Sequence, residues 1–354
     1  MKIAITADHH LTTKKTHPER FTAMEDILHR CADERVDLLI IAGDLFDQTN
    51  TNYADFETLF HKHLPQNLLT YIVPGNHDLG LTRDALALEQ IRVYTKPSLV
   101  SPADSGPLIL LLPYREGATM GEEIAPFADD LPAHRWLLIS HGDWTGGEKY
   151  PDPYEPGIYM PLTHSDLTTY KPQEIFLGHI HRPLDKGRVH YPGSPCPVNI
   201  TETGLRRFLI YDSEKVEVTS QLVDSPVVYF QEMFVALPVE NEVDYLAHQI
   251  SERISSWGLP EGWEEKVRVR VKVTGYTRNR AAVKETILAG FDSFSFYKNQ
   301  EPDLSELNYS LDPDRSHIVQ QMKTWLDDLE WREDPRQPDK DQILAEALKA
   351  IYGA

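Results

Sequence analysis

The sequence predicts an α/β protein whose main sheet is buried on both faces. Three observations support this class. Apolar strands such as Asp37–Ala42, Leu68–Val73 and Trp136–Ser140 alternate with amphipathic helices. Most of these strands are apolar throughout instead of alternating with polar residues, which is typical of sheets covered on both sides. Every polar cluster lies at the end of a strand, which is where sites in such sheets lie.

Length and composition limit the classes of function. The chain has 354 residues, enough for two or three domains, and a formal net charge of −20 with a pI near 5.1. Such acidity argues against a free-standing nucleic-acid binder, unless bound metal ions or a partner supply positive charge. The two cysteines, Cys31 and Cys196, indicate neither a disulfide framework nor a thiolate metal site.

The N-terminus gives no sign of a targeting segment. Residues Met1–Ile5 read as a strand that leads into Asp8, not as a signal peptide. No apolar run approaches the length of a membrane span. We therefore expect a cytoplasmic protein with no membrane partner.

The first 225 residues are expected to form one domain. Its first predicted helix begins near Pro18, and three more cover about Tyr53–Leu64, Arg83–Val93 and Gly121–Leu131. A long loop is expected over Gly142–Pro172. Its predicted strands are Lys2–Ala7, Asp37–Ala42, Leu68–Val73, Leu108–Leu112, Trp136–Ser140, Glu174–Leu177, Val189–Tyr191, Arg207–Tyr211 and Val216–Leu222.

A boundary is expected near Ser225-Pro226, followed by a small α/β domain over residues 226–302. Residues 303–354 would then hold a polar acidic linker and two C-terminal helices, Pro313–Trp331 and Lys340–Tyr352, split by the charged, proline-containing residues 333–338. The predicted elements of residues 226–302 are strand Tyr229–Leu237, helix Val243–Trp257, strand Lys266–Thr274, helix Ala281–Ala289 and strand Ser293–Tyr297.

The stretch Gly75-Asn76-His77-Asp78 is the centre of the predicted site. It follows a buried strand ended by Pro74, and the glycine allows neighbouring side chains to converge. An amide oxygen suits a divalent cation, and an imidazole beside it suits proton transfer. The alternative interpretation is an ordinary polar turn.

Four further clusters strengthen the functional interpretation. Asp8 and His10 are two residues apart at a strand end, as are His179 and His181, so an extended backbone would place each pair on one face. Asp44 and Asp47 follow Gly43, and His141 follows another strand. Any one cluster alone could be a solvated loop. Five together supply oxygen and imidazole ligands suited to Mn²⁺, Fe²⁺ or Zn²⁺, and too many for one ion. Two ions about 3.5–4 Å apart, bridged by a carboxylate, would use them all.

These motifs, in this order, resemble the calcineurin-like metallophosphoesterases, whose pattern is D-x-H, G-D-x-x-D, G-N-H-D, a lone histidine after a strand, and G-H-x-H. The resemblance implies a two-sheet sandwich flanked by helices, followed by a small α/β cap and C-terminal helices. It also implies that His77 faces the scissile phosphate and that Asp47 and Asp78 lie behind the ligands. The implied ligands are Asp8, His10, Asp44 and His181 for the first ion, and Asn76, His141 and His179 for the second, with Asp44 bridging.

A narrower resemblance, to the SbcD-type DNA exonucleases, rests on residues 176–183 and on Tyr191-Pro192-Gly193-Ser194-Pro195. It implies a DNA nuclease, a 3′→5′ exonuclease with endonuclease activity as a second mode, that uses two divalent ions, expected to be Mn²⁺. Its partners would be DNA and an SbcC-like coiled-coil ATPase, in break repair and recombination. His9 and Thr12 depart from the common pattern of these enzymes, which leaves open how the loop after Leu11 meets DNA.

Two other functions remain open. One keeps the metals and hydrolyses nucleotides or small phosphoesters, which would need neither cap nor tail. The other is a nuclease-dead scaffold for the ATPase, against which the full ligand set and His77 argue.

Candidate DNA contacts come from basic residues. Arg182 follows a ligand histidine and could reach a phosphate or pair with an acidic neighbour. Residues 266–273 alternate valine with Lys266, Arg268, Arg270 and Lys272, a cationic face suited to a phosphate backbone or, alternatively, to the protection of an edge strand. The loop aromatics Trp144, Tyr150, Tyr154 and Tyr159 are expected to pack the loop rather than to stack on bases.

Two surfaces are expected to bind proteins. The resemblance implies a homodimer formed through Tyr53–Leu64 and Arg83–Val93, whose apolar residues Phe56, Leu59, Phe60, Leu86 and Leu88 could exceed the needs of one core. The C-terminal helices are expected to bind the ATPase through helically spaced apolar stripes, with burial against the protein's own cap as the alternative. These stripes are Ile318, Met322, Trp325 and Leu329 in the first helix and Ile343, Leu344, Ala347, Leu348 and Ile351 in the second.

Overall fold

The computed structural model describes all residues except 49–52, 104–105, 147–156, 330–339 and 354. It divides into two compact units. The first unit comprises Met1–Val198 with Leu205–Val228, and the second comprises Asn199–Gly204 with Tyr229–Ala354. The loop residues Tyr150 and Tyr154, the end of the helix expected to reach Trp331 and the linker 333–338 lie outside the described residues.

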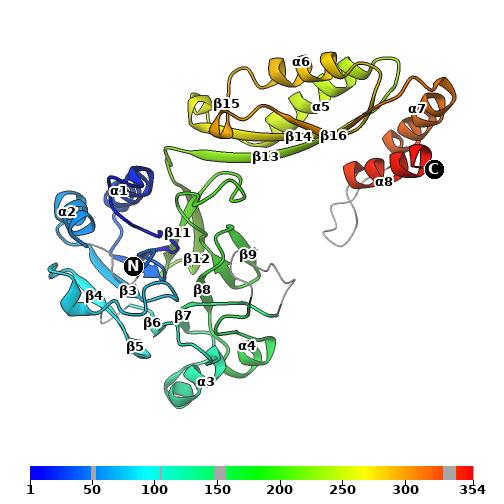
Figure 1. Cartoon of the computed structure of the whole chain (residues 1–354). Coiled ribbons are helices and arrows are strands. Elements are labelled where there is room, and N and C mark those ends of the chain that lie inside the picture. The colour runs from blue at the N-terminus through cyan, green and yellow to red at the C-terminus, as the bar shows by residue number, and fades with distance from the viewer. Residues whose placement is uncertain (49–52, 104–105, 147–156, 330–339, 354) are drawn as a thin grey trace. The chain divides into compact units, whose positions relative to one another are not determined.

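The first unit contains two mixed sheets (Figure 1). The first sheet has the order β12-β11-β1-β2-β3-β4, and its strands β1 to β4 run parallel. Their bounds are β1 Lys2–Thr6, β2 Leu38–Ala42, β3 Leu69–Val73, β4 Ile91–Val93, β11 Arg207–Asp212 and β12 Glu217–Leu222. The second sheet has the order β5-β6-β7-β8-β10-β9, with bounds β5 Ser98–Val100, β6 Leu108–Leu112, β7 Trp136–His141, β8 Glu174–Gly178, β9 Leu184–Lys186 and β10 Val189–Tyr191.

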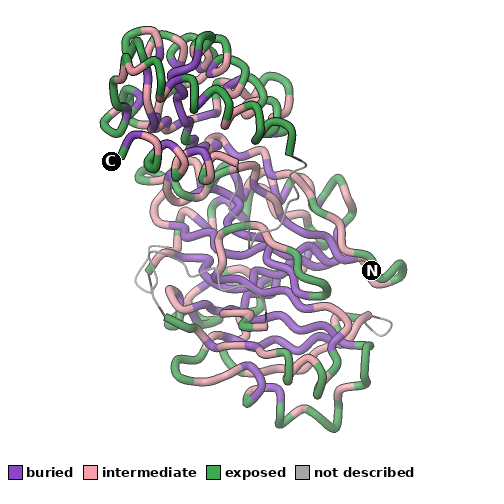
Figure 2. The backbone as a smooth tube through the Cα atoms, turned by 90° about the vertical axis from the view of Figure 1, so that its right-hand side faces the viewer, coloured by how far each residue is buried: buried purple, intermediate pink, exposed green. Residues whose placement is uncertain are grey.

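Three apolar clusters show that these sheets form the centre of a four-layer sandwich. One cluster joins the inner faces of the sheets, with Ile5 and Ile40 from the first and Leu111 and Ile139 from the second. Helices α1 (Pro18–Asp33) and α2 (Ala54–His63) bury their apolar faces on the outside of the first sheet. Helices α3 (Met120–Ile124) and α4 (His164–Tyr170) cover the second. The strands at the centre are buried along their length (Figure 2), so the predicted fold class is confirmed.

The second unit is built on a small sheet. Strands β13 (Val228–Ala236) and β15 (Ser295–Phe296) flank β14 (Val267–Thr277), and β16 (Asp303–Tyr309) also pairs with β14. Helices α5 (Glu242–Ser256) and α6 (Arg280–Gly290) bury Ile250 and Ile287. Helices α7 (Pro313–Asp327) and α8 (Lys340–Tyr352) pack with Val235 and Leu237 in one apolar cluster.

Three predicted elements are wrong. Residues 83–93 are not a helix: a 3₁₀ turn, Arg83–Ala85, leads to β4, whose branched Ile91 and Val93 suit the strand that pairs with β3. The long loop contains α4, begun by a capping box in which Thr163 and Asp166 satisfy each other's backbone amides. The expected linker contains β16, a strand with polar residues on both faces and only Leu307 buried, so it shows no strand period.

The two apolar stripes expected on the C-terminal helices differ in the structure: the stripe of α8 is buried within the unit, and most of the stripe predicted for α7 is exposed. Leu344 and Leu348 of α8 are buried in the unit's own cluster, as the alternative interpretation stated. In α7 the buried apolar residues are Val319 and Leu326, each one position along from a residue of the predicted stripe. The predicted residues Ile318, Trp325 and Leu329 are 50%, 70% and 55% exposed. Because α7 carries two apolar sets offset by one residue, helical spacing alone could not decide which one is buried.

Candidate metal centre

The predicted site residues of the first unit lie where strands from both sheets end. Because the carboxyl ends of β1, β2 and β3 meet those of β7 and β8, five short segments converge. Asp8 and His10 follow β1, Asp44 and Asp47 follow β2, Asn76 and His77 follow β3, His141 ends β7, and His179 and His181 follow β8.

The backbone at this convergence is not extended, which corrects the expected geometry. Asp8, His10 and Asp44 have φ values of 56°, 46° and 49°, and His179 has 95°, all in a region that side chains other than glycine rarely adopt. The amides of Asp8 and His10 donate to the carbonyl oxygens of Gly43 (3.1 Å) and Asp44 (3.0 Å). The ligand pairs are therefore brought together by left-handed turns held by cross-strand bonds. Strain of this kind is concentrated at functional sites.

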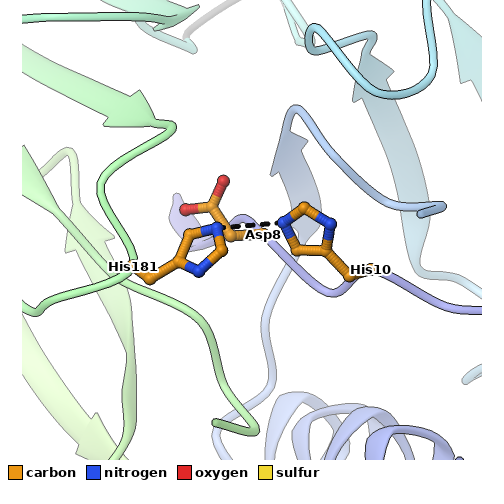
Figure 3. Close-up of side chains that lie close together, drawn as sticks. All are labelled: Asp8, His10 and His181. Atoms are coloured by element: carbon orange, nitrogen blue, oxygen red, sulfur yellow. Dashed lines mark hydrogen bonds between the residues drawn. The ribbon is translucent and has the colours of Figure 1, made fainter. Parts of the chain in front are cut away.

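Asp8, His10 and His181 form the first group (Figure 3). Nε2 of His10 lies 3.0 Å from Nε2 of His181, and Oδ1 of Asp8 accepts from the amide of His179 at 2.8 Å. Oδ2 of Asp8 is buried and has no hydrogen-bond partner within the described structure. An unpartnered carboxylate oxygen in a group with two imidazole nitrogens fits a cation.

His141 is the centre of the second group, which contains Asp8 and Asp44 as well. Its Nδ1–H donates to the carbonyl oxygen of Ala42 at 3.0 Å, so Nε2 is the nitrogen that faces the group and could hold a metal. Nε2 lies 3.3 Å from Oδ2 of Asp44 and 2.8 Å from Oδ1 of Asn76. The same Oδ2 of Asp44 lies 3.8 Å from Nε2 of His10, so Asp44 stands between the two groups.

His77 and His179 lie beside these groups. The amide of His77 donates to Oδ1 of Asp44 (2.9 Å), and its Nδ1 is 3.0 Å from the carbonyl oxygen of Asp47. His77 also falls in a possible ligand group with His10 and Asp44, so proximity alone does not separate a ligand from a residue facing substrate. The ring of His179 is 5.5 Å from that of His141, and its Nε2 is 3.9 Å from Oδ1 of Asp143.

Asp47 and Asp78 support the groups from behind. Oδ1 of Asp47 lies 3.4 Å from Nδ1 of His10. Asp78 is buried and accepts from the amides of Gly75 (2.6 Å) and Leu45 (2.8 Å), which ties the loop after β3 to the loop after β2.

Burial and charge shift the acidities of the site. Burial raises the pKa of Asp8, and it raises the pKa of Asp78 to about 6 with help from the charge of Asp44. Burial alone would lower the pKa of His141, but the Asp44 and Asp8 carboxylates raise it to about 10. Burial opposes ionisation of Asp44, yet His141 and His10 hold its pKa below the ordinary value. Buried carboxylates thus depend on nearby positive charge, which a divalent ion would supply.

Glycines leave room for this packing. A Cβ on Gly43 would stand 2.0 Å from Nδ1 of His141, and one on Gly178 would stand 2.0 Å from the carbonyl oxygen of Ala42. The site offers only nitrogen and oxygen donors, and one buried oxygen of Asp8 has no hydrogen-bond partner within the described structure. Gly43 leaves the space that His141 occupies. These residues therefore fit divalent metal ions.

Sequence reasoning missed two buried arginines that hold the ligand loops. Arg20 of α1 donates to the carbonyl oxygen of His10 and lies 4.0 Å from Asp47. Arg206 donates to the carbonyl oxygens of Ser194 (3.0 Å) and His181 (2.9 Å). Nothing in the sequence marks these arginines as buried. Tyr159 was expected to pack the loop, and its ring lies 4.5 Å from that of His179.

The candidate DNA contacts divide between the units. Arg182 is exposed in the first unit. The cationic residues of β14 alternate with buried valines as predicted, but β14 is an interior strand, so edge protection does not explain them. All three have partners in the unit: Lys272 pairs with Glu306 (2.5 Å), Arg270 lies over Tyr297, and Arg268 donates to the carbonyl oxygen of Glu265 (2.7 Å). Lys266, the residue before β14, lies over Trp263.

Comparison with known proteins agrees with the site. The family model for calcineurin-like phosphoesterases matches residues 1–204, and the chain belongs to this family, whose members bind divalent metals. It is therefore a metal-dependent phosphoesterase by class.

Among curated proteins, the chain is similar to the "Uncharacterized metallophosphoesterase YhaO" of Bacillus subtilis, with 28% identity over 52% of this chain and 47% of that protein. It is also similar to the D component of the SbcCD nuclease of Escherichia coli, with 26% identity over 59% of this chain. The matches span 47% and 64% of the lengths of these relatives. A solved archaeal phosphodiesterase aligns over 63% of this chain and 100% of that one, at 16% identity and a TM-score of 0.35. No helix in the described part of the chain has the length and apolarity needed to cross a membrane.

Proposed function

We propose that the chain is a two-metal DNA nuclease, a 3′→5′ exonuclease with endonuclease activity as a second mode, that works with a coiled-coil ATPase in DNA break repair and recombination. The observation that carries the proposal is the position of Asp44 between His10 and His141, 3.8 and 3.3 Å from their Nε2 atoms. A carboxylate between two ligand groups could hold two metal ions close together, which suits two-metal phosphodiester hydrolysis. The similarity to a component of a named nuclease supports DNA as the substrate.

In this proposal, Asp44 would be shared by both ions. Asp8, His10 and His181 would complete the first set of ligands, and Asn76, His141 and His179 would complete the second. When bound, the two ions, expected to be Mn²⁺, neutralise the phosphodiester and lower the pKa of a water toward neutrality.

His77 is assigned to the substrate rather than to a metal. Its Nδ1–H can donate to the carbonyl oxygen of Asp47, which fixes the ring, and Nε2 is the nitrogen assigned to the phosphate. From there it stabilises the charge that develops on the phosphate or donates a proton to the departing sugar oxygen. Asp47 orients His10, and Asp78 holds the loop that carries Asn76 and His77.

Arg182 and the cationic face of β14 are proposed to contact the DNA backbone. Because β14 is interior to its sheet, its charges do not serve to protect an edge. Arg270→Glu and Lys272→Glu, made together, should weaken DNA binding and its dependence on salt while leaving hydrolysis of a small phosphodiester unchanged. Unchanged DNA affinity would refute the contact.

The exposed face of α7 is proposed to bind the ATPase. Ile318 and Trp325 of α7 are at least half exposed, as is Leu329 two residues after the helix ends, whereas Val319 and Leu326 of the helix are buried. Trp325→Ala should weaken binding of the purified ATPase partner without changing thermal stability. Leu288→Ala, at an exposed leucine of α6, is the matched control. Equal affinity of both variants would refute the assignment. Truncation near Pro302 cannot serve as a test, because it removes β16 and uncovers Val235 and Leu237.

A homodimer stays a prediction, but four of the five residues expected to form it are already buried in the first unit's own core. Phe56 and Phe60 are fully buried, and Leu59 and Leu86 are 5% and 7% exposed, whereas Leu88 is partly buried. Light scattering at micromolar concentration tests the dimer, and a monomer mass would remove it.

The substrate is tested directly. Purified protein with Mn²⁺ should be offered labelled duplex, single-stranded and hairpin DNA, with and without the ATPase. Shortening from 3′ ends supports the nuclease. Hydrolysis of nucleotides or small phosphoesters without DNA cleavage would support the small-substrate enzyme instead, and no hydrolysis of either would support the scaffold.

A further inference from the structure

A separate cluster of potential metal ligands lies away from the strand ends. It is on α1 and α2, the two helices of the first unit that cover the first sheet. Glu25 and His29 are four residues apart on α1, and His63 is the last residue of α2. One ligand atom from each of the three lies within 4.8 Å of the others. The mechanism proposed above uses none of them.

The two imidazoles face each other. Nε2 of His29 is 3.0 Å from Nδ1 of His63, and the ring centroids are 5.0 Å apart. Two imidazole nitrogens on one tetrahedral Zn²⁺, each at about 2.0–2.1 Å, stand roughly 3.3 Å apart. A zinc ion could therefore replace the hydrogen bond between the two rings if the nitrogens moved apart by only a few tenths of an ångström.

Glu25 determines which nitrogen of His63 is free. Its Oε1 lies 3.3 Å from Nε2 of His63, on the other side of the ring from His29. A carboxylate there favours a proton on Nε2, so Nδ1 presents its lone pair toward His29. This carboxylate, histidine, metal order is the usual arrangement around a protein-bound zinc ion.

The surroundings hold His63 on a rigid frame. The His63 side chain is only 11% exposed, so water competes little for its ring nitrogens. Lys14 and Lys62 add positive charge nearby, which Glu25 offsets. Beneath the cluster, Leu28 and Phe60 pack the two helices into one core, so the ligands stand on fixed elements.

We propose that His29 and His63 bind one divalent transition-metal ion of the Zn²⁺ type, with Glu25 orienting His63, and that this ion joins α1 to α2. Two imidazoles and a carboxylate favour Zn²⁺, Ni²⁺ or Cu²⁺ over Mg²⁺ or Ca²⁺. The site is distinct from the candidate metal centre and does not depend on the proposed nuclease function.

The proposal is tested by measuring the zinc content of the wild-type protein and of its variants. The protein is stripped with a chelator, saturated with Zn²⁺ and dialysed, and zinc is counted by elemental analysis. The wild type should hold one more equivalent than His29→Ala or His63→Ala. His61→Ala, at an exposed histidine on the same helix, is the matched control and should hold as much as the wild type. Glu25→Gln should weaken binding of that equivalent about 10–100-fold.

Two readouts keep the result unambiguous. Zn²⁺ should raise the melting temperature of the wild type more than that of His29→Ala, because an ion that binds only the folded state stabilises it. Mn²⁺-dependent hydrolysis should be the same in both, since His29 lies outside the candidate centre. If His63→Ala does not fold, His29→Ala carries the test. Equal zinc content in wild type and His29→Ala would overturn the proposal.

Discussion

Gly43, which follows β2, packs against His141 of the second sheet, and replacing it with alanine should disable the site. Its φ is +91°, and a Cβ there would lie 2.0 Å from Nδ1 of His141 and 2.5 Å from its Cγ. Contacts under about 3.0 Å do not occur between real atoms of this kind, so the backbone or the His141 ring must move. His141 is fully buried and its Nδ1 is already bonded to Ala42, so it has little room.

The cost has two parts. An L-residue in a left-handed conformation costs about 1–2 kcal/mol. Forcing an extra methyl group into a packed site adds about 1–3 kcal/mol. The first unit should therefore lose about 2–5 kcal/mol of unfolding free energy. A displacement of His141 on the order of 1 Å should also lower hydrolysis about 100-fold.

Gly187→Ala provides the control. Gly187 belongs to the same unit and also has a positive φ, +63°, but no atom lies within 4 Å of the position that a Cβ on this residue would take. It should lose only about 1–2 kcal/mol and keep full activity and metal content. Urea denaturation, metal analysis and phosphodiester hydrolysis are measured on both variants. If Gly43→Ala matched Gly187→Ala in stability and activity, the close packing of His141 against the β2 loop would be refuted.

Two further predictions concern groups that hold the site or its sheet. Arg206→Lys should destabilise the first unit by about 3 kcal/mol and slow hydrolysis, because a lysine cannot replace the forked bonds to Ser194 and His181; unchanged urea denaturation and rate would contradict this. His190 lies between Asp185 (2.7 Å) and Glu174 (3.1 Å). Burial alone would lower the pKa of His190, but these two carboxylates raise it, so its contribution is complete below about pH 6.5 and is lost as pH rises through the raised value. Burial opposes ionisation of Asp185, yet His190 and Arg207 lower its pKa to about 2, so its contribution is lost only as pH falls below about 4. His190→Gln should therefore cost more stability at pH 5.5 than at pH 8.5 in urea denaturation, and an equal cost at both would contradict the pairing.

The strand-end clusters could be predicted from sequence because apolar runs locate strands, and parallel strands bring their carboxyl ends together. The turns that unite them could not. Asp8, His10 and Asp44 adopt positive φ without being glycine, a conformation imposed by bonds from neighbouring strands. An extended backbone was the default expectation, and it was wrong for this reason.

Two strands at sheet edges, β4 and β16, also could not be predicted from the sequence. β4 and β16 are short or polar on both faces, so neither shows a strand period. The α7 stripes could be recognised as apolar, but which one is buried depends on Val235 and Leu237, far away in the chain. Buried arginines leave no local pattern, because their partners are carbonyl oxygens of distant loops.

The central claim is that Asp44 bridges two ions while His77 acts on the phosphate without holding a metal. Metal content and DNA cleavage of Asp44→Ala and His77→Ala, measured side by side with Mn²⁺, test it most directly. Asp44→Ala should lose metal from both positions. His77→Ala should keep both ions and lose cleavage. Full metal occupancy in Asp44→Ala, or near-normal cleavage by His77→Ala, would contradict the account.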